Sequence, residues 1–155
     1  MNGTGTVAAI HTAPEAEAPM QSRDAVEAVA GKGLRGDRYF KGGGTFSDID
    51  GGGRELTLTE AEAIEAIERE ADIAIRFNEH RRNVTTRDAA LNHLVGKRFR
   101  IGDAVCEGVR LCEPCVHLRR LTVDGIEDAL THRGGLRADI VDGGTIRIED
   151  SIEPL

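Results

Sequence analysis

The chain has 155 residues, 39% of them hydrophobic, and its 27 acidic residues outnumber its 20 basic ones. This length suits a single domain over residues 1–155, and a net charge of −7 disfavours a nucleic-acid partner, which calls for a basic surface. No apolar run approaches the ~20 residues of a membrane-spanning helix, and residues 1–5 lack the start of a signal peptide. Three cysteines, an odd number, argue against a disulfide framework. We therefore expect a cytoplasmic protein without membrane contact.

The first part of the chain alternates short β-favouring runs with loops. Strands are expected over residues 4–12 and 25–29, and Gly31 and Gly33 end the second of them. Residues 41–53 contain six glycines and almost no apolar side chains, which predicts a flexible loop. This loop is not a phosphate-binding loop, because no Gly-Lys-Ser/Thr sequence closes it.

The clearest helix is expected at about residues 59–70, directly after a strand over 54–58. Thr59 and Glu62 have the spacing of a capping box, in which each side chain satisfies the other residue's free backbone N–H. Apolar residues recur at helical spacing and predict a helix packed on a sheet. These residues are Ala61, Ile64, Ile67 and Ala71.

The second part of the chain is again rich in short strands separated by glycine turns. Many short strands at close spacing favour a barrel-like sheet over parallel α/β layers. The sequence thus predicts a mainly β fold, a mixed β-barrel with a few helices. The expected elements are a strand over 83–86, a hairpin of 97–101 and 104–111, a helical or turn-like stretch over 116–130, and a second hairpin of 137–141 and 145–148.

The strongest candidates for chemistry are Cys112 and Cys115, which form a Cys-x-x-Cys motif with Pro114 between them. They follow the end of a strand, and a loop at such a place keeps a thiol accessible and held in position. The third cysteine, Cys106, lies within an alternating strand. It is expected to act as a small buried hydrophobe.

Several uses of these thiols compete. In the first, Cys106, Cys112, Cys115 and His117 hold a zinc ion, although structural zinc sites normally take ligand pairs from separate knuckles. In the second, the Cys-x-x-Cys motif is a dithiol redox switch, although such motifs usually open a helix in a βαβ unit. In the third, a single thiolate carries sulfur or ligates a metal. A packing role for both cysteines is the remaining interpretation.

Cationic residues gather at two further places. Residues 79–83 place Arg81 and Arg82 beside Asn83 just before a strand, and this combination suits a phosphate-bearing ligand. Residues 131–135 combine Arg133 with glycines that let a ligand approach the backbone. Either segment can also be a solvated surface. A third group around a tight turn, Arg35, Asp37 and Arg38, is equally consistent with a structural ion-pair cluster.

Taken in order, the motifs of the chain resemble those of the MOSC domain, named for the C-terminal domain of molybdenum cofactor sulfurase. Each motif alone is unspecific, but their succession covers nearly the whole chain. The motifs are Gly31-x-Gly33-Leu34-x-Gly36-Asp37-Arg38-Tyr39, Arg54-x-Leu56-Thr57-Leu58, Arg81-Arg82-Asn83-Val84, Leu94-Val95-Gly96-Lys97-Arg98-Phe99, Cys112-x-Pro114-Cys115, His132-x-Gly134-Gly135-Leu136 and Gly143-Gly144-x-Ile146.

The resemblance implies a MOSC-type β-barrel with one reactive cysteine, which corresponds to Cys115. In relatives that reduce N-hydroxylated compounds, the matching cysteine ligates molybdenum, and the Arg-x-Asn motif holds the phosphate-bearing pterin of the molybdenum cofactor (molybdopterin). That motif corresponds to Arg81 and Asn83. Arg82, His117 and Arg133 are expected to add positive charge around the thiolate and the anionic cofactor. Cys112 is a second cysteine that some members share.

The chain differs from the reductases that it resembles. Those reductases are longer proteins, and some of them carry an iron–sulfur domain. Its three cysteines cannot build a plant-type cluster, which takes four. The resemblance therefore implies either the cofactor-binding component of a molybdenum-dependent oxidoreductase, with a separate electron-transfer partner, or a sulfur carrier served by a sulfur-donor protein. Pyridoxal phosphate is not expected. The alternative is a dithiol redox or zinc-binding module.

Overall fold

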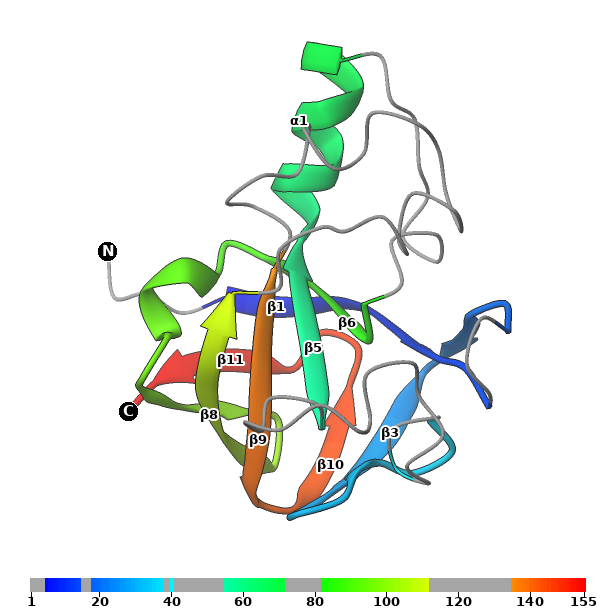
Figure 1. Ribbon diagram of the computed structural model, residues 1–155, viewed down its shortest axis with the longest axis vertical. Helices are drawn as coiled ribbons and strands as arrows, with labels where there is room; N and C mark the ends of the chain where they lie inside the picture. Colours follow the sequence, from blue (N-terminus) through cyan, green and yellow to red (C-terminus); the bar gives the residue numbers. More distant parts are fainter. Residues whose placement is uncertain (1–4, 15–17, 38–39, 41–54, 72–81, 112–134) are drawn as a thin grey trace.

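The computed structural model describes residues 5–14, 18–37, 40, 55–71, 82–111 and 135–155, and all that follows concerns these ranges. They form a mainly β fold (Figure 1). The elements are β1 (Gly5–Thr12), β2 (Gln21–Arg23), β3 (Ala25–Val29), β4 (Gly33–Leu34), β5 (Leu56–Glu60), α1 (Ala61–Ala71), β6 (Val84–Arg87), the 3-10 helix η1 (Leu91–Leu94), β7 (Arg98–Ile101), β8 (Ala104–Leu111), β9 (Leu136–Asp142), β10 (Gly144–Arg147) and β11 (Ser151–Pro154).

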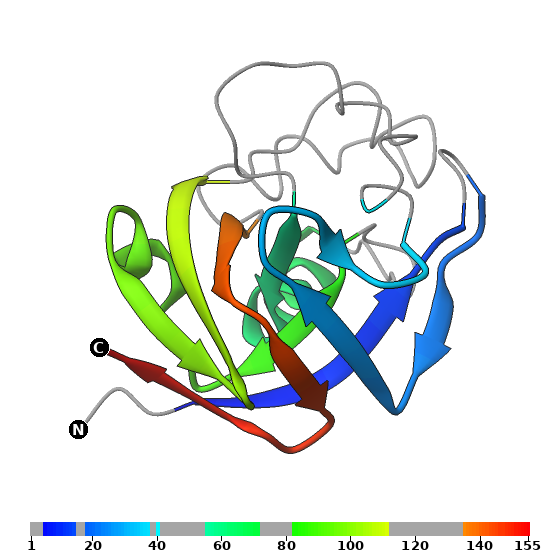
Figure 2. The ribbon, with the colours of Figure 1, turned by 90° about the horizontal axis from the view of Figure 1, so that it is seen from below.

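Seven strands close into a barrel. They follow the order β11-β7-β8-β9-β5-β6-β1, and a pairing between β11 and β1 completes the ring, while β2 extends β1 at the outside. Figure 2 shows the first and last strands of the chain lying side by side along this ring. One pair, β5 with β6, is parallel, and the other pairs are antiparallel. The expectation of a mixed β-barrel is confirmed.

A second sheet of order β10-β3-β4 packs beside the barrel. The expected hairpin between residues 137–141 and 145–148 is wrong, although both strands exist as β9 and β10. β9 pairs with β5 and β8 in the barrel, whereas β10 pairs with β3. The turn between them passes tightly against the Ala28 carbonyl at Gly143, where an added Cβ would lie 2.7 Å from that oxygen. Glycine therefore lets the chain cross from one sheet to the other.

The barrel interior is filled by aliphatic side chains and one aromatic ring, that of Phe99. Alternate residues of each strand point inward, as a strand with one buried face requires. Cys106 of β8 belongs to this cluster and is 0% exposed, which confirms that it is a buried hydrophobe. The inward residues nearest the site described below are Ile10, Leu58, Val84 and Leu136.

The one α-helix within the described part of the chain, α1, begins two residues later than the predicted helix. Three residues of the predicted apolar stripe, Ala61, Ile64 and Ile67, are buried. The predicted capping box is wrong. Thr59 belongs to β5, and its buried hydroxyl has no hydrogen-bond partner among the described residues. Glu62 instead accepts the backbone N–H of Asp88 at 2.8 Å. Because β5 pairs with β6 as far as Glu60, Thr59 is a strand residue and does not cap the helix.

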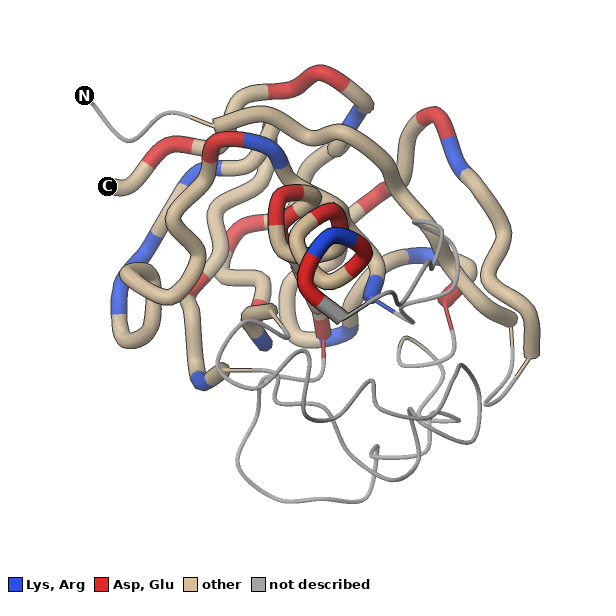
Figure 3. The backbone as a smooth tube through the Cα atoms, turned by 90° about the horizontal axis from the view of Figure 1, so that it is seen from above, with Lys and Arg blue, Asp and Glu red and all other residues tan. Residues whose placement is uncertain are grey.

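Carboxylates of α1 and of the residue before it hold the chain that leaves β6. Arg87 makes two hydrogen bonds of 3.1 Å with Glu65, and Glu60 accepts the backbone N–H of Leu91 at 3.3 Å. Figure 3 shows α1 nearly end-on, with most of its charged positions acidic. The start of the helix is thus fastened to the segment that leads into η1. None of the helices described has the length and apolar character needed to cross a membrane.

Candidate functional site

Five neighbouring strands are in register across one end of the barrel. Ile10 of β1 pairs with Val84 of β6, and Val84 pairs with Leu58 of β5. Leu58 in turn pairs with Leu136 of β9, which pairs with Leu111 of β8. Residues that are far apart in sequence but adjacent to these five therefore come from the same end of the barrel.

This register places the strand residues next to the three predicted site segments, Val84, Leu111 and Leu136, at the same end of the barrel. Asn83 directly precedes Val84, Cys112 directly follows Leu111, and Arg133 lies three residues before Leu136 in the sequence. Of the predicted site residues, the structure describes Arg82 and Asn83 and brings both to this end. The others lie outside the described residues, as do the predicted loop over 41–53 and the predicted helical stretch over 116–130. They are Arg81, Cys112, Cys115, His117 and Arg133.

Asn83 is the centre of a hydrogen-bond network. Its side-chain oxygen Oδ1 accepts the backbone N–H of Thr57 at 3.2 Å and the Thr57 hydroxyl at 3.1 Å. Its Nδ2 group donates to the carbonyl of His11 at 3.2 Å and to Asp37 Oδ1 at 3.3 Å. The Asn83 side chain is 1% exposed, so its amide is engaged by the fold on every side. It holds β1, β5 and the start of β6 together.

Asp37 reaches this network through a glycine-rich turn. Its carboxylate also accepts the backbone N–H of Ala13 at 3.1 Å, and the residue is fully buried. The turn that leads to it contains Gly31, Gly33 and Gly36, with φ values of 76°, 124° and 91°. Only glycine adopts such values without strain. The turn thus delivers a carboxylate from the second sheet to the end of β1.

The group of Arg35, Asp37 and Arg38, interpreted from sequence as an ion-pair cluster, is divided by the structure. Arg35 pairs with Glu27 at 2.8 Å on the surface, away from the network. The hydrogen bond and the charge of Glu27 raise the pKa of the Arg35 guanidinium. Asp37 turns inward instead, and Arg38 lies outside the described residues.

The outward faces of β1, β5 and β6 carry a buried polar layer. Ile10, Leu58 and Val84 point into the core, so their sequence neighbours point to the opposite face. Five of these neighbours are polar and nonetheless buried, with exposures of 4% or less. We define this polar layer as His11, Thr57, Thr59, Asn83 and Thr85.

Two atoms of the polar layer have no hydrogen-bond partner among the described residues: Nδ1 of His11 and Oγ1 of Thr59. Burial lowers the pKa of the His11 imidazole, because the charged form loses its hydration. Burial therefore favours the neutral form of His11. Buried polar atoms are almost always paired, so two such atoms, on the strands β1 and β5 that flank β6, indicate a place for water or a polar ligand.

Arg82 lies beside the polar layer and is only 8% exposed, although it carries a guanidinium group. It was among the predicted cofactor-binding residues, and the structure places it next to Asn83 at the start of β6. Sequence reasoning missed His11 and Thr57. Thr57 lies in the Leu-Thr-Leu run of the strand predicted over 54–58, where a threonine between two leucines is the available signal. His11 has no comparable signal.

Cys106 is not part of the polar end of the barrel. It lies in the barrel interior, and burial, together with the charges of Glu55 and Asp139, raises its pKa to about 12. Such a thiol stays protonated at neutral pH, whereas zinc takes the thiolate. The burial of Cys106 therefore disfavours the four-ligand zinc site, whose other three predicted ligands, Cys112, Cys115 and His117, lie outside the described residues. Among the described residues, no group of three or more His, Cys, Asp or Glu side chains could hold a metal ion.

Comparisons with known proteins agree with this architecture. The sequence profile of the MOSC domain matches residues 10–153. No curated protein matches the chain in sequence. The YuaD protein of Bacillus subtilis has a similar crystal structure, with a TM-score of 0.81 and 15% identity over 96% of this chain and 94% of that one.

Two proteins called YiiM are also similar in structure. The protein of Geobacillus stearothermophilus gives a TM-score of 0.74 at 13% identity, over 97% of this chain and 75% of that one. The protein of Escherichia coli gives 0.67 at 16% identity, over 97% of this chain and 69% of that one. At these identities the likeness concerns the fold alone.

Proposed function

The chain belongs to the MOSC domain family, and on that basis we propose that it binds the molybdenum cofactor at the polar end of its barrel. In this proposal Cys115 supplies the single working thiolate. The observation that carries it is the strand register, which brings the flanks of the Arg81-Arg82-Asn83, Cys112–Cys115 and Arg133–Gly135 segments to one end of the barrel.

The described residues fit a polar, anionic group at this end. The polar layer contains two buried atoms without partners among the described residues, and Arg82 adds a buried positive charge next to it. A pterin presents donors and acceptors, and its phosphate needs compensating charge with directed N–H groups. In our proposal Arg81, Arg82, Arg133 and His117 supply that charge.

We assign Asn83 a positioning role rather than direct contact with the phosphate. Its amide already makes hydrogen bonds to Thr57, His11 and Asp37. These bonds fix the point at which the chain enters β6, immediately after Arg81 and Arg82. In this proposal the two residues of the Arg-x-Asn motif have different roles. The arginine binds the ligand, and the asparagine holds the strands that position the arginine.

Cys115 can serve in two ways, and both need a thiolate. A bound molybdenum cofactor supplies oxygen-transfer redox chemistry, for which Cys115 is the proposed metal ligand, and thiolates are ligands suited to soft metals. As a sulfur carrier, the Cys115 thiolate attacks the terminal sulfur of a donor persulfide. A new S–S bond forms on Cys115, the S–S bond of the donor breaks, and the donor leaves as a thiolate.

The two uses imply different partners. An oxidoreductase component requires a separate protein that delivers electrons, because the three cysteines of the chain cannot build a four-cysteine cluster. A carrier requires a sulfur-donor protein. Both uses depend on reduced thiols, which we propose the cytoplasm maintains.

Substitution of the two cysteines tests the proposal. Protein made in a host that synthesises the cofactor is compared as wild type, Cys115→Ser, Cys112→Ser and the core control Cys106→Ala, by molybdenum and pterin content and by mass after treatment with a persulfide donor. We expect Cys115→Ser to lose all three signals, because a hydroxyl is a far harder and less acidic group than a thiol. Cys112→Ser is expected to reduce them only in part.

Equal and complete loss in both variants, with a reversible two-proton mass change on oxidation, would instead support the dithiol alternative. Absence of molybdenum, pterin and added sulfur from the wild type would overturn the proposal as a whole. Cys106→Ala is expected to leave all three signals unchanged, since Cys106 lies inside the barrel.

A further inference from the structure

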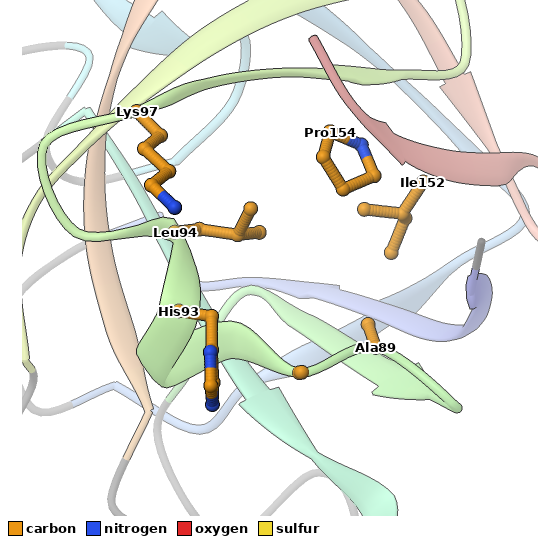
Figure 4. Close-up of a pocket in the computed structure, with 7 residues that line it drawn as sticks. Ala89, His93, Leu94, Lys97, Ile152 and Pro154 are labelled. Atoms are coloured by element: carbon orange, nitrogen blue, oxygen red, sulfur yellow. The ribbon is translucent and has the colours of Figure 1, made fainter. Parts of the chain in front are cut away.

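A separate pocket of about 240 Å³ opens between η1 and β11, on the flank of the barrel where both ends of the described chain lie (Figures 1 and 4). One wall is formed by η1 and the residues around it, and the other by the last strand. The lining residues are Ala89, Ala90, His93, Leu94, Lys97, Ile152 and Pro154. None of them belongs to the polar layer or to the predicted cofactor site.

The floor of this pocket is apolar. Three of the lining residues belong to the hydrophobic core: Leu94 is 4% exposed, Ile152 1% and Ala89 5%. The nearby backbone groups are already paired: Lys97 donates its N–H to the Leu94 carbonyl at 3.1 Å, and Leu155 donates its N–H to the Arg98 carbonyl at 3.0 Å. The floor therefore offers a ligand apolar contact and few hydrogen bonds.

The rim of the pocket is cationic on one side. Figure 4 shows the Lys97 side chain extending along the wall toward Leu94, opposite Ile152 and Pro154. Its neighbour Arg98 is 3.7 Å from Glu107, but the Lys97 ammonium makes no ion pair or hydrogen bond with any of the described residues. His93 lies on the same wall, near Glu60, whose carboxyl pKa is raised by burial.

We infer that this pocket binds a small aliphatic monocarboxylate, with its hydrocarbon tail on the apolar floor and its carboxylate at Lys97. A water molecule takes about 30 Å³ of liquid, so the pocket of about 240 Å³ holds about eight groups of that size, which corresponds to the carbons and oxygens of an acid of about six carbons. Each buried methylene contributes about 0.8 kcal/mol. A dicarboxylate or sugar would bury polar groups that the floor cannot satisfy.

The inference is independent of the proposed function, because it uses no cysteine and none of the cofactor-binding residues. Its test is titration of the purified protein with hexanoate, followed by methyl NMR. We expect saturable shifts at the methyl groups of Leu94 and Ile152. Hexanol has the same tail without the charge, and we expect it to bind at the same methyl groups about fivefold more weakly, the factor that ~1 kcal/mol represents.

Two variants locate the charge. Lys97→Gln is expected to lower the affinity for hexanoate about fivefold and to leave hexanol binding unchanged. Arg100→Gln removes the same charge from an exposed position of β7 that does not line the pocket, and both affinities are expected to stay as in the wild type. Absence of saturable shifts at Leu94 and Ile152, equal binding of hexanoate and hexanol, or equal losses in the two variants would overturn the inference.

Discussion

At the scale of single residues, Asn83 links three strands through one amide group. A hydrogen bond in a folded protein has a small net effect, but a buried group left without its partner costs about 1–3 kcal/mol. Asn83 satisfies the backbone N–H and hydroxyl of Thr57 and approaches the carboxylate of Asp37. Its importance lies in the groups that would remain unpaired without it.

We predict that Asn83→Ala lowers the free energy of unfolding by about 2–4 kcal/mol, because it leaves the Thr57 N–H and the His11 carbonyl buried without this partner. Urea denaturation followed by circular dichroism measures the change. Ser22→Ala, at an exposed position of the neighbouring β2, is the control and is expected to change the stability by less than about 0.5 kcal/mol. A loss of that small size for Asn83→Ala would contradict its structural role.

Cys106 gives a prediction about alkaline pH. Its folded pKa of about 12 exceeds the ~8.5 of an unfolded cysteine, so above pH 8.5 the unfolded chain releases a proton that the folded chain keeps. The stabilisation present below pH 8.5 is therefore lost as the pH rises toward 12. Between pH 8 and 10 this thiol should lower the free energy of unfolding by about 2 kcal/mol.

This effect is measured as a difference between two variants that both carry Cys112→Ser and Cys115→Ser. One retains Cys106 and the other carries Cys106→Ala, so other titrating groups cancel. We expect the stability advantage of the chain with Cys106 to shrink over this pH range. A constant difference, or rapid alkylation of Cys106 in the native protein at pH 8, would contradict the burial of the thiol.

At the scale of elements, η1 depends on a close approach to β8. An added Cβ at Gly108 would collide with the carbonyl oxygen of Leu94, and Gly108 also donates its N–H to the Lys97 carbonyl at 2.9 Å. Glu60 holds the other side of η1 through the Leu91 N–H. Gly108 and the carboxylate of Glu60 thus position η1, which forms one wall of the pocket.

We expect Gly108→Ala to destabilise the protein by about 3 kcal/mol, because backbone atoms of Leu94 must move to admit the methyl group. Gly96→Ala is the matched control. Gly96 has a φ of 77° but nothing within 4 Å of an added Cβ, so only backbone strain of about 1–2 kcal/mol is expected. Thermal unfolding compares the two, and a larger loss at Gly96 would contradict the steric argument.

The elements also show what the sequence could predict and what it could not. The stripe of Ala61, Ile64 and Ile67 located α1, since helical periodicity is a local property. The capping box at Thr59 was wrong because pairing with β6, a non-local contact, extended β5 to Glu60. Likewise the sequence predicted the strands β9 and β10 on either side of Gly143, but it did not predict that they belong to different sheets.

At the scale of the whole molecule, the barrel is closed by a short contact between its outermost strands. β1 and β11 are registered at Gly5 with Ile152 and at Thr6 with Ser151. Many short strands with glycine turns predicted the barrel, and the predicted site residues Arg82 and Asn83 lie at its polar end. The inclusion of His11 and Asp37 in the same polar end depends on registers between segments up to 72 residues apart, as in the Asn83–His11 bond, and no local pattern specifies these.

We predict that Ile152→Ala lowers the free energy of unfolding by about 2–5 kcal/mol, since the side chain is 1% exposed at the closing seam. Leu155→Ala is the control on the same terminal segment. Leu155 is 64% exposed, and its substitution is expected to cost less than about 0.5 kcal/mol. Chemical denaturation compares the variants, and similar small losses in both would show that closure at β11 contributes little.

The pairing of β1 with β11 also has a consequence for how the protein is made. A ribosome produces β1 before most of its partners. Residues 21–23 follow soon and pair with its end, but Gly5 and Thr6 wait for residues 151 and 152, and the pairing with β6 waits for residues 84–87. During translation β1 therefore presents exposed N–H and C=O groups of the kind that promote strand-to-strand aggregation. Because contacts of such sequence separation slow folding, we expect the nascent chain to need protection by a chaperone until β11 has emerged.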